Sequence, residues 1–101
     1  MEPRIEQISN LLKKYKPEKV ILFGSHAKGS SDHYSDIDLV IIKRTKKHFL
    51  DRIKDVLKIL KPNFAIDILV YTPKEFKKMS SKEYSFLEYV KREGKVIYAK
   101  S

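Results

Sequence analysis

Apolar residues follow two patterns along this chain, short unbroken runs and helical spacing, and the two alternate from one end to the other. The runs have the length of buried strands. They lie at residues 19–24, 36–43, 64–71 and 95–99. The helical spacing predicts two amphipathic helices, one from Pro3 to just before Pro17 and one over residues 49–60, with a brief helix expected after Gly24.

Two further helices are expected in the last third of the chain, because their start signals are present. Thr72-Pro73-Lys74-Glu75 has the form of a capping box with proline at the first helical position. Ser80-Ser81-Lys82-Glu83 has the form of a second capping box, which should open a helix that ends at Gly94. The element order is then α-β-α-β-α-β-α-α-β, which predicts an α+β fold with helices packed on one mixed β-sheet. A length of 101 residues predicts a single domain over residues 1–101.

Composition and charge narrow the classes of function. The chain carries 22 Lys and Arg against 13 Asp and Glu, a net charge of +9, which favours phosphate-bearing or acidic partners. Both halves of the chain are basic to a similar degree, so the charge does not favour a dedicated nucleic-acid groove. With no cysteine, the sequence offers no disulfide, thiolate ligand or cysteine nucleophile. No apolar run is long enough to span a membrane, and the expected location is cytoplasmic.

Three aspartates do not fit a simple core. Asp36 and Asp38 stand two residues apart at the start of a predicted strand, so their side chains should leave one face about 6–7 Å apart. Asp67 interrupts an apolar run, where an ionised carboxylate is costly unless it is paired or bound to a cation. If the two strands are neighbours, the three carboxylates meet and offer the oxygen ligands that Mg²⁺ prefers. Taken singly, each is more simply explained as a turn, a cap or a backbone-bonded side chain.

A loop of small residues follows the first predicted strand and precedes these aspartates. It reads Gly24-Ser25-His26-Ala27-Lys28-Gly29-Ser30-Ser31. Glycine allows the backbone to approach a phosphate closely, and a helix that starts at Ser25 would offer N–H groups to an anion. The segment is not a Walker loop, because Ser30 stands where that motif requires lysine. By itself, Gly-Ser after a strand is an ordinary turn.

Together, the loop and the aspartates resemble the signature of the nucleotidyltransferases of the DNA polymerase β superfamily. The family pattern is G-S-x-A-R-G, a spacer, S-D-[IL]-D-[LF] and a third acid on a later strand. The chain matches it in order and spacing from Gly24 to Gly29, from Ser35 to Leu39 and at Asp67. Lys28 replaces the usual arginine, which keeps the positive charge but loses bidentate contact with phosphate. The small size points to the minimal nucleotidyltransferase branch.

The resemblance implies a polymerase β-like fold and a role for each matching residue. Asp36, Asp38 and Asp67 would be catalytic and would hold two Mg²⁺ ions, and Asp67 would also help to activate the acceptor hydroxyl. The β- and γ-phosphates of ATP would bind at Gly24 and Ser25. Lys28 would be part of the same nucleotide site, in a role that its departure from the pattern leaves open.

The resemblance also implies Mg²⁺-dependent transfer of NMP, usually AMP from ATP, to a hydroxyl of a macromolecule. Members of the minimal branch are commonly antitoxins that adenylylate a tyrosine of a helical HEPN-domain toxin. A homo- or hetero-oligomer is compatible with this resemblance. One alternative is an interaction protein that neutralises such a partner by binding alone. The other is a small basic nucleic-acid-binding domain, which the diffuse charge disfavours.

Two further features have no role in that resemblance. The basic run Lys43–His48 (KRTKKH) is similar to a nucleic-acid patch, but its place between a strand and a helix favours a solvated loop. Tyr34, close to the aspartates in sequence, is the tyrosine expected to lie nearest a substrate.

Overall fold

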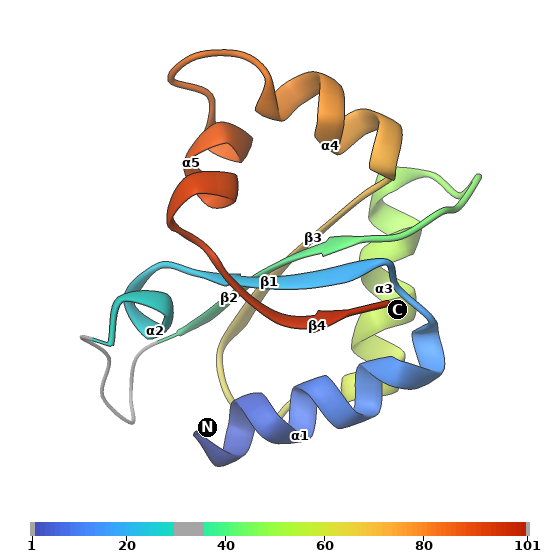
Figure 1. Cartoon of the computed structure of the whole chain (residues 1–101). Coiled ribbons are helices and arrows are strands. Elements are labelled where there is room, and N and C mark those ends of the chain that lie inside the picture. Colours follow the sequence, from blue (N-terminus) through green and yellow to red (C-terminus); the bar gives the residue numbers. More distant parts are fainter. Residues whose placement is uncertain (1, 30–35, 101) are drawn as a thin grey trace.

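A computed structural model describes residues 2–29 and 36–100 as a four-stranded sheet with helices on both faces (Figure 1). The predicted element order is confirmed, with one turn of 3-10 helix added after the first helix. In chain order the elements are α1 (Pro3–Leu12), η1 (Lys13–Tyr15), β1 (Lys19–Phe23), α2 (Ser25–Lys28), β2 (Ile37–Ile42), α3 (Phe49–Leu60), β3 (Ile66–Tyr71), α4 (Pro73–Ser80), α5 (Phe86–Glu93) and β4 (Lys95–Ala99). Across the part of the chain described, no helix is both long and apolar enough to cross a bilayer.

The sheet is mixed, as the sequence predicts. Its strand order is β3-β2-β1-β4. The pair β2 and β3 is parallel, whereas β1 runs antiparallel to both of its neighbours. The α+β class is therefore confirmed, and β4 is an edge strand.

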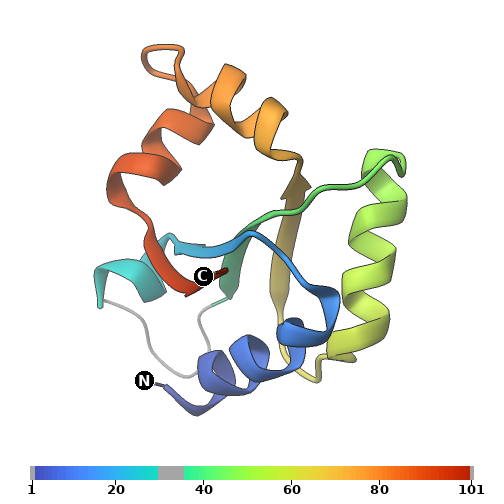
Figure 2. The same cartoon turned by 45° about the vertical axis from the view of Figure 1, so that its right-hand side comes forward.

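The sheet separates two hydrophobic clusters, and β2 contributes to both. Successive side chains of a strand point to opposite faces. Leu39 and Ile41 accordingly pack with α1 and α3, whereas Val40 and Ile42 pack with α4 and α5. Figure 2 shows these two pairs of helices on opposite sides of the sheet. Cover on both faces explains why β2 reads as an almost unbroken apolar run.

The strand directions create two different edges of another kind, each formed by the ends of the strands and not by an outer strand. The register pairs Phe23 with Asp38 and Asp38 with Asp67, so the end of β1 meets the starts of β2 and β3 at one edge. At the other edge β2 and β3 both end, and the chain continues into α3 and α4. These two helices lie on opposite faces, because Val56 of α3 belongs to the α1 cluster and Phe76 of α4 belongs to the α5 cluster.

One of the two predicted capping boxes is present. The Glu75 N–H donates to Thr72 Oγ1 over 3.1 Å, and the Thr72 N–H donates to Glu75 Oε1 over 2.8 Å. The second box is wrong, because Ser80 is the last residue of α4 and α5 begins after Ser85. The Ser85 hydroxyl accepts a backbone N–H from the first turn of α5, and Tyr84, with φ at 61°, turns the chain just before it.

Arg52 of α3 is a buried charged side chain, 7% exposed. Its guanidinium donates to the Val70 carbonyl over 3.2 Å, to Glu75 Oε1 over 2.7 Å and, through Nε, to the Lys47 carbonyl over 2.9 Å. The first two of these bonds tie α3 to β3 and to the first turn of α4. The hydrogen bond from Arg52 keeps the pKa of Glu75 below its usual value.

We expect Arg52→Ala to lower the free energy of unfolding by about 2–4 kcal/mol, because it leaves a buried carbonyl without its donor and removes the partner of Glu75. Urea denaturation would measure the loss. The control is Arg92→Ala, which removes an exposed arginine paired with Glu88 and should cost less than about 0.5 kcal/mol. Equal losses in the two variants would contradict the role assigned to Arg52.

Candidate active site

Two of the predicted acidic residues lie side by side. Asp38 and Asp67 are the second residues of β2 and β3, and they are direct partners in the parallel register. Their carboxyl groups are close enough to share a hydrogen bond when one of the two is protonated. They lie on the face covered by α4 and α5, because Val40, two residues after Asp38, packs there. The two strands are neighbours, which meets the condition under which Asp38 and Asp67 were expected to meet.

The pKa of Asp38 is raised above the usual value for aspartate. Desolvation by burial is the largest cause, followed by the hydrogen bond with Asp67 and the negative charges of Asp67 and Asp36. The electrostatic effect of His26 acts in the opposite direction. Asp36 and His26 therefore lie within electrostatic reach of the pair. A bound cation would relieve the repulsion among these carboxylates.

The carboxylates do not form a closed metal cage. Asp36 is exposed and precedes β2. Among residues 2–29 and 36–100, no three His, Asp or Glu side chains are grouped closely enough to enclose a metal ion. Mg²⁺ does not require such a cage, since it commonly takes one or two protein carboxylates and completes its shell with water and phosphate oxygens. The pair Asp38 and Asp67 fits that requirement, with Asp36 next to it as a further candidate.

Gly24 brings the backbone against this pair. It follows β1 with φ at 77°, a left-handed conformation that side chains rarely adopt. A Cβ built at this position would lie 2.5 Å from Asp38 Oδ2, closer than any real contact. Glycine is required here for both reasons. The Asp38 carboxylate consequently packs directly against the turn that leads into α2.

The brief helix α2 follows at once, as expected, and begins at Ser25. Lys28 ends it, and its ammonium lies 5.7 Å from the centre of the Tyr89 ring of α5. Because α5 covers the face that carries Asp38 and Asp67, this cation–π contact holds Lys28 on the same side of the sheet as the carboxylates.

Aromatic residues that the sequence did not assign to the site also border it. Phe23, the register partner of Asp38 on β1, meets Phe86 of α5 edge to face with ring centres 5.2 Å apart. Phe86 is 44% exposed and offers an apolar surface beside the carboxylates. The sequence predicts that Phe23, Phe86 and Tyr89 are packing residues. Phe23 and Tyr89 do pack in the α5 cluster and Phe86 packs on Phe23, so no sequence signal distinguishes them as site residues.

The spacer between the loop and the aspartates includes residues that the sequence analysis singled out. Ser30, Ser31, His33, Tyr34 and Ser35 lie outside the described residues. The expectation that Tyr34 lies near a substrate therefore stays a prediction.

We expect Asp38→Asn to stabilise the metal-free protein at pH 7. The pKa of Asp38 is higher in the folded than in the unfolded chain. The free energy of unfolding therefore falls as pH rises from the unfolded-state pKa to the folded-state pKa, and the ionised carboxylate is destabilising at neutral pH. In EDTA, the midpoint of thermal unfolding should rise by a few degrees, and the gain should shrink as pH falls towards about 4.

Asp55→Asn is the matched control, because the hydrogen bond from Lys47 lowers the pKa of Asp55 and makes its ionised form favourable. That variant should not be stabilised. A lower melting temperature for Asp38→Asn at pH 7 in EDTA would show that the carboxylate is not under the repulsion described.

Comparison with known proteins gives a matching family and a related protein. The family model described as "Polymerase beta, Nucleotidyltransferase" matches residues 6–101. A protein of Methanocaldococcus jannaschii named "Putative protein adenylyltransferase" is 34% identical over 100 residues, which cover 96% of this chain and 97% of that protein.

Two solved structures have a similar fold. One, described as a "putative nucleotidyltransferase" from Sulfolobus solfataricus, matches with a TM-score of 0.68 and 18% identity, over 97% of this chain and 82% of the other. The second belongs to a "toxin-antitoxin with AMP-PNP" and matches with a TM-score of 0.60 and 18% identity, over 96% of this chain and 74% of the other.

Proposed function

Because the chain belongs to the polymerase β nucleotidyltransferase family, in its minimal branch, we propose that it transfers AMP from ATP to a hydroxyl of a protein partner. The observation that carries the proposal is the Asp38–Asp67 pair, held against the Gly24 turn at one edge of the sheet. A protein acceptor and AMP as the transferred group are supported by the name of the archaeal relative. The proposed catalytic unit is the single domain of residues 1–101, and the proposed location is cytoplasmic.

The carboxylates have the roles that the family signature implies. Asp36, Asp38 and Asp67 would hold Mg²⁺, two ions in the proposed complex, which supply neutralisation of the triphosphate and of the attacking and leaving oxygens. Asp67 would orient the acceptor hydroxyl and accept its proton. The oxygen of that hydroxyl forms a bond to the α-phosphorus, the bond to the leaving oxygen breaks, and pyrophosphate departs.

The loop and the helix α5 would hold the nucleotide. Gly24 and Ser25 would bind the β- and γ-phosphates, since the glycine backbone can approach a phosphate without steric hindrance. Lys28, held by Tyr89, would neutralise a phosphate oxygen as a point charge rather than as a bidentate partner. The chain thus contributes mainly positioning and charge.

We also propose that the acceptor is a tyrosine of a helical HEPN-domain toxin, which makes this chain an antitoxin. The solved toxin-antitoxin structure of similar fold and the resemblance of the signature to the minimal branch support this proposal. The alternative, neutralisation by binding alone, is less favoured because a protein that only binds has no need for two adjacent carboxylates that repel each other and raise the pKa of Asp38.

The test is transfer of label from α-³²P-ATP to the product of a neighbouring gene, with Mg²⁺ present. We expect labelling of the partner that disappears when EDTA is added or when the acceptor tyrosine is changed to phenylalanine. Rescue of toxin-expressing cells by Asp36→Asn/Asp38→Asn, without any labelling by the wild type, would instead favour the binding alternative.

A further inference from the structure

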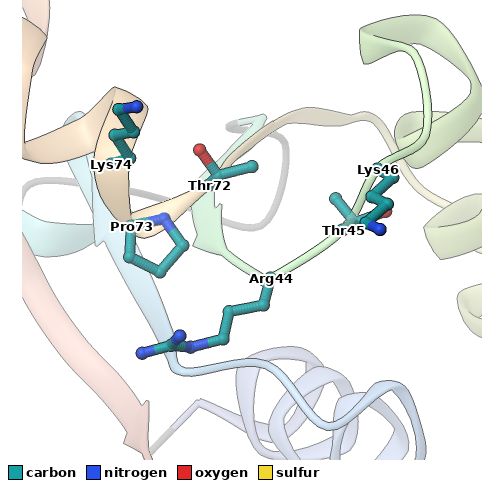
Figure 3. A pocket seen from close by; sticks show the side chains of 6 residues that line it. All are labelled: Arg44, Thr45, Lys46, Thr72, Pro73 and Lys74. Atoms are coloured by element: carbon teal, nitrogen blue, oxygen red, sulfur yellow. The ribbon is translucent and has the colours of Figure 1, made fainter.

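A hollow of about 580 Å³ lies at the edge of the sheet opposite the aspartates. Figure 3 shows its walls, which come from the loop after β2 and from the start of α4. The lining residues are Arg44, Thr45, Lys46, Thr72, Pro73 and Lys74. From Asp67 to Thr72 the extended chain covers about 16 Å, so the hollow is separate from the catalytic edge.

The topology of the sheet opens this hollow. The Lys43 N–H donates to the Tyr71 carbonyl over 2.9 Å, one ladder bond beyond the ends of β2 and β3. After that bond the chain leaves β2 for α3 on one face and leaves β3 for α4 on the other. Neighbouring parallel strands whose following helices lie on opposite faces leave a crevice at their carboxyl ends, which is where open α/β sheets bind ligands.

The charged side chains that line the hollow are all cationic. Arg44 is exposed and pairs through Nε with Glu18 over 3.1 Å. Lys46 and Lys74 form no ion pair with any residue in the described ranges 2–29 and 36–100. Glu75, the acid next to Lys74 in sequence, is bound to Arg52. The walls therefore carry an excess of positive charge that nothing in the described chain neutralises.

The two threonines add hydrogen-bond donors. Thr45 Oγ1 accepts the Lys47 N–H over 3.1 Å, and Thr72 Oγ1 accepts the Glu75 N–H over 3.1 Å. A hydroxyl that accepts a bond still has its own proton to donate. The side chains around the hollow thus present donors and positive charges, which suit the oxygens of a phosphate.

We propose that the hollow binds a nucleoside phosphate. Its volume falls within the roughly 300–1,000 Å³ of small-molecule sites. In Figure 3 the Arg44 side chain runs below the Pro73 ring, Lys46 lies on the other wall and Lys74 extends beyond Pro73. The planar Arg44 guanidinium can stack on a base and the apolar Pro73 ring can pack against it, and the two flexible lysines can turn to the phosphate. This site does not rest on the proposed transfer reaction.

The experiment is a titration of the ¹⁵N-labelled protein with adenosine 5′-monophosphate in EDTA at about 0.15 M salt, where long-range charge effects are screened. We expect saturable shifts of the Arg44, Thr45, Lys46 and Lys74 amide signals, with a Kd below about 1 mM. The Ser25 and Ala27 amides report the catalytic edge independently. The absence of AMP transfer would therefore not affect this binding result, and the absence of binding at the hollow would not affect the transfer assay.

Two double variants that each remove two positive charges distinguish binding at the hollow from general electrostatic attraction. Lys46→Gln/Lys74→Gln should raise the Kd about tenfold, whereas Lys58→Gln/Lys91→Gln, which removes two exposed lysines elsewhere, should change it less than about threefold. Equal weakening in both variants, or shifts that do not saturate, would overturn the proposal. Binding of a short RNA without binding of the mononucleotide would also overturn it and would assign this surface to nucleic acid.

Discussion

Asp67→Asn should reduce the rate of AMP transfer by about 10²–10⁴-fold, because the variant loses both the proton acceptor and one partner of the carboxylate pair. Labelled AMP on the partner protein, followed over time at saturating ATP and Mg²⁺, would measure the loss. Asp67 is exposed on an edge strand, so the variant should fold normally. Circular dichroism and the thermal midpoint would verify this.

The matched control is Asp51→Asn, an exposed aspartate in the first turn of α3. It removes the same charge from the protein but no group at the catalytic edge, so its transfer rate should stay within about twofold of the wild type. A folded Asp67→Asn variant with undiminished transfer would show that the carboxylate pair is not the catalytic centre.

Gly24→Ala should lose both stability and activity. The new Cβ would lie 2.5 Å from Asp38 Oδ2 on a backbone with φ at 77°, so either the turn or the Asp38 carboxylate must move. We expect a loss of about 2–4 kcal/mol in the free energy of unfolding and of at least about tenfold in transfer rate. Urea denaturation and the labelling assay would measure the two effects.

Gly29→Ala separates the two causes. Gly29 has a similar φ of 72°, but a Cβ there meets no atom of residues 2–29 and 36–100 within 4 Å, so this variant should lose only the backbone contribution of about 1–2 kcal/mol. Adding Asp38→Ala to Gly24→Ala should then recover part of the lost stability, since the clashing atoms are gone. Equal losses for the two glycine variants, with no recovery, would place the cost in the backbone alone.

Much of the fold could be predicted from the sequence because local signals agree with the tertiary structure. The apolar run in β2 is strand-like by composition and is buried on both faces, so the local composition and the tertiary packing favour the same element. The start of α5 could not be located in this way. Ser80 and Ser85 are both plausible caps, and the choice depends on the turn at Tyr84, which the local pattern does not encode.

The residue types of the candidate site could be predicted from the sequence, but their arrangement in space could be predicted only in part. The spacing of Asp36 and Asp38 indicates one face of a strand, but only the parallel register brings Asp67 beside Asp38. The contact between Lys28 and Tyr89 joins residues that are distant in sequence, so it depends on the packing of α5 over the sheet. The basic run Lys43–His48 was expected to be a solvated loop, and its Arg44–Lys46 part lines the hollow.

The parallel pairing of β2 and β3 limits how the length of this chain can vary in evolution or by design. Side chains alternate between the faces of a strand, so a slip of one position would turn Asp67 towards α1 and α3 and away from Asp38. Insertions or deletions inside either strand should therefore abolish function even in a folded protein. The connections at residues 44–48 and 61–64 can absorb such changes without moving the two aspartates, because the backbone hydrogen bonds that align β2 with β3 lie outside them.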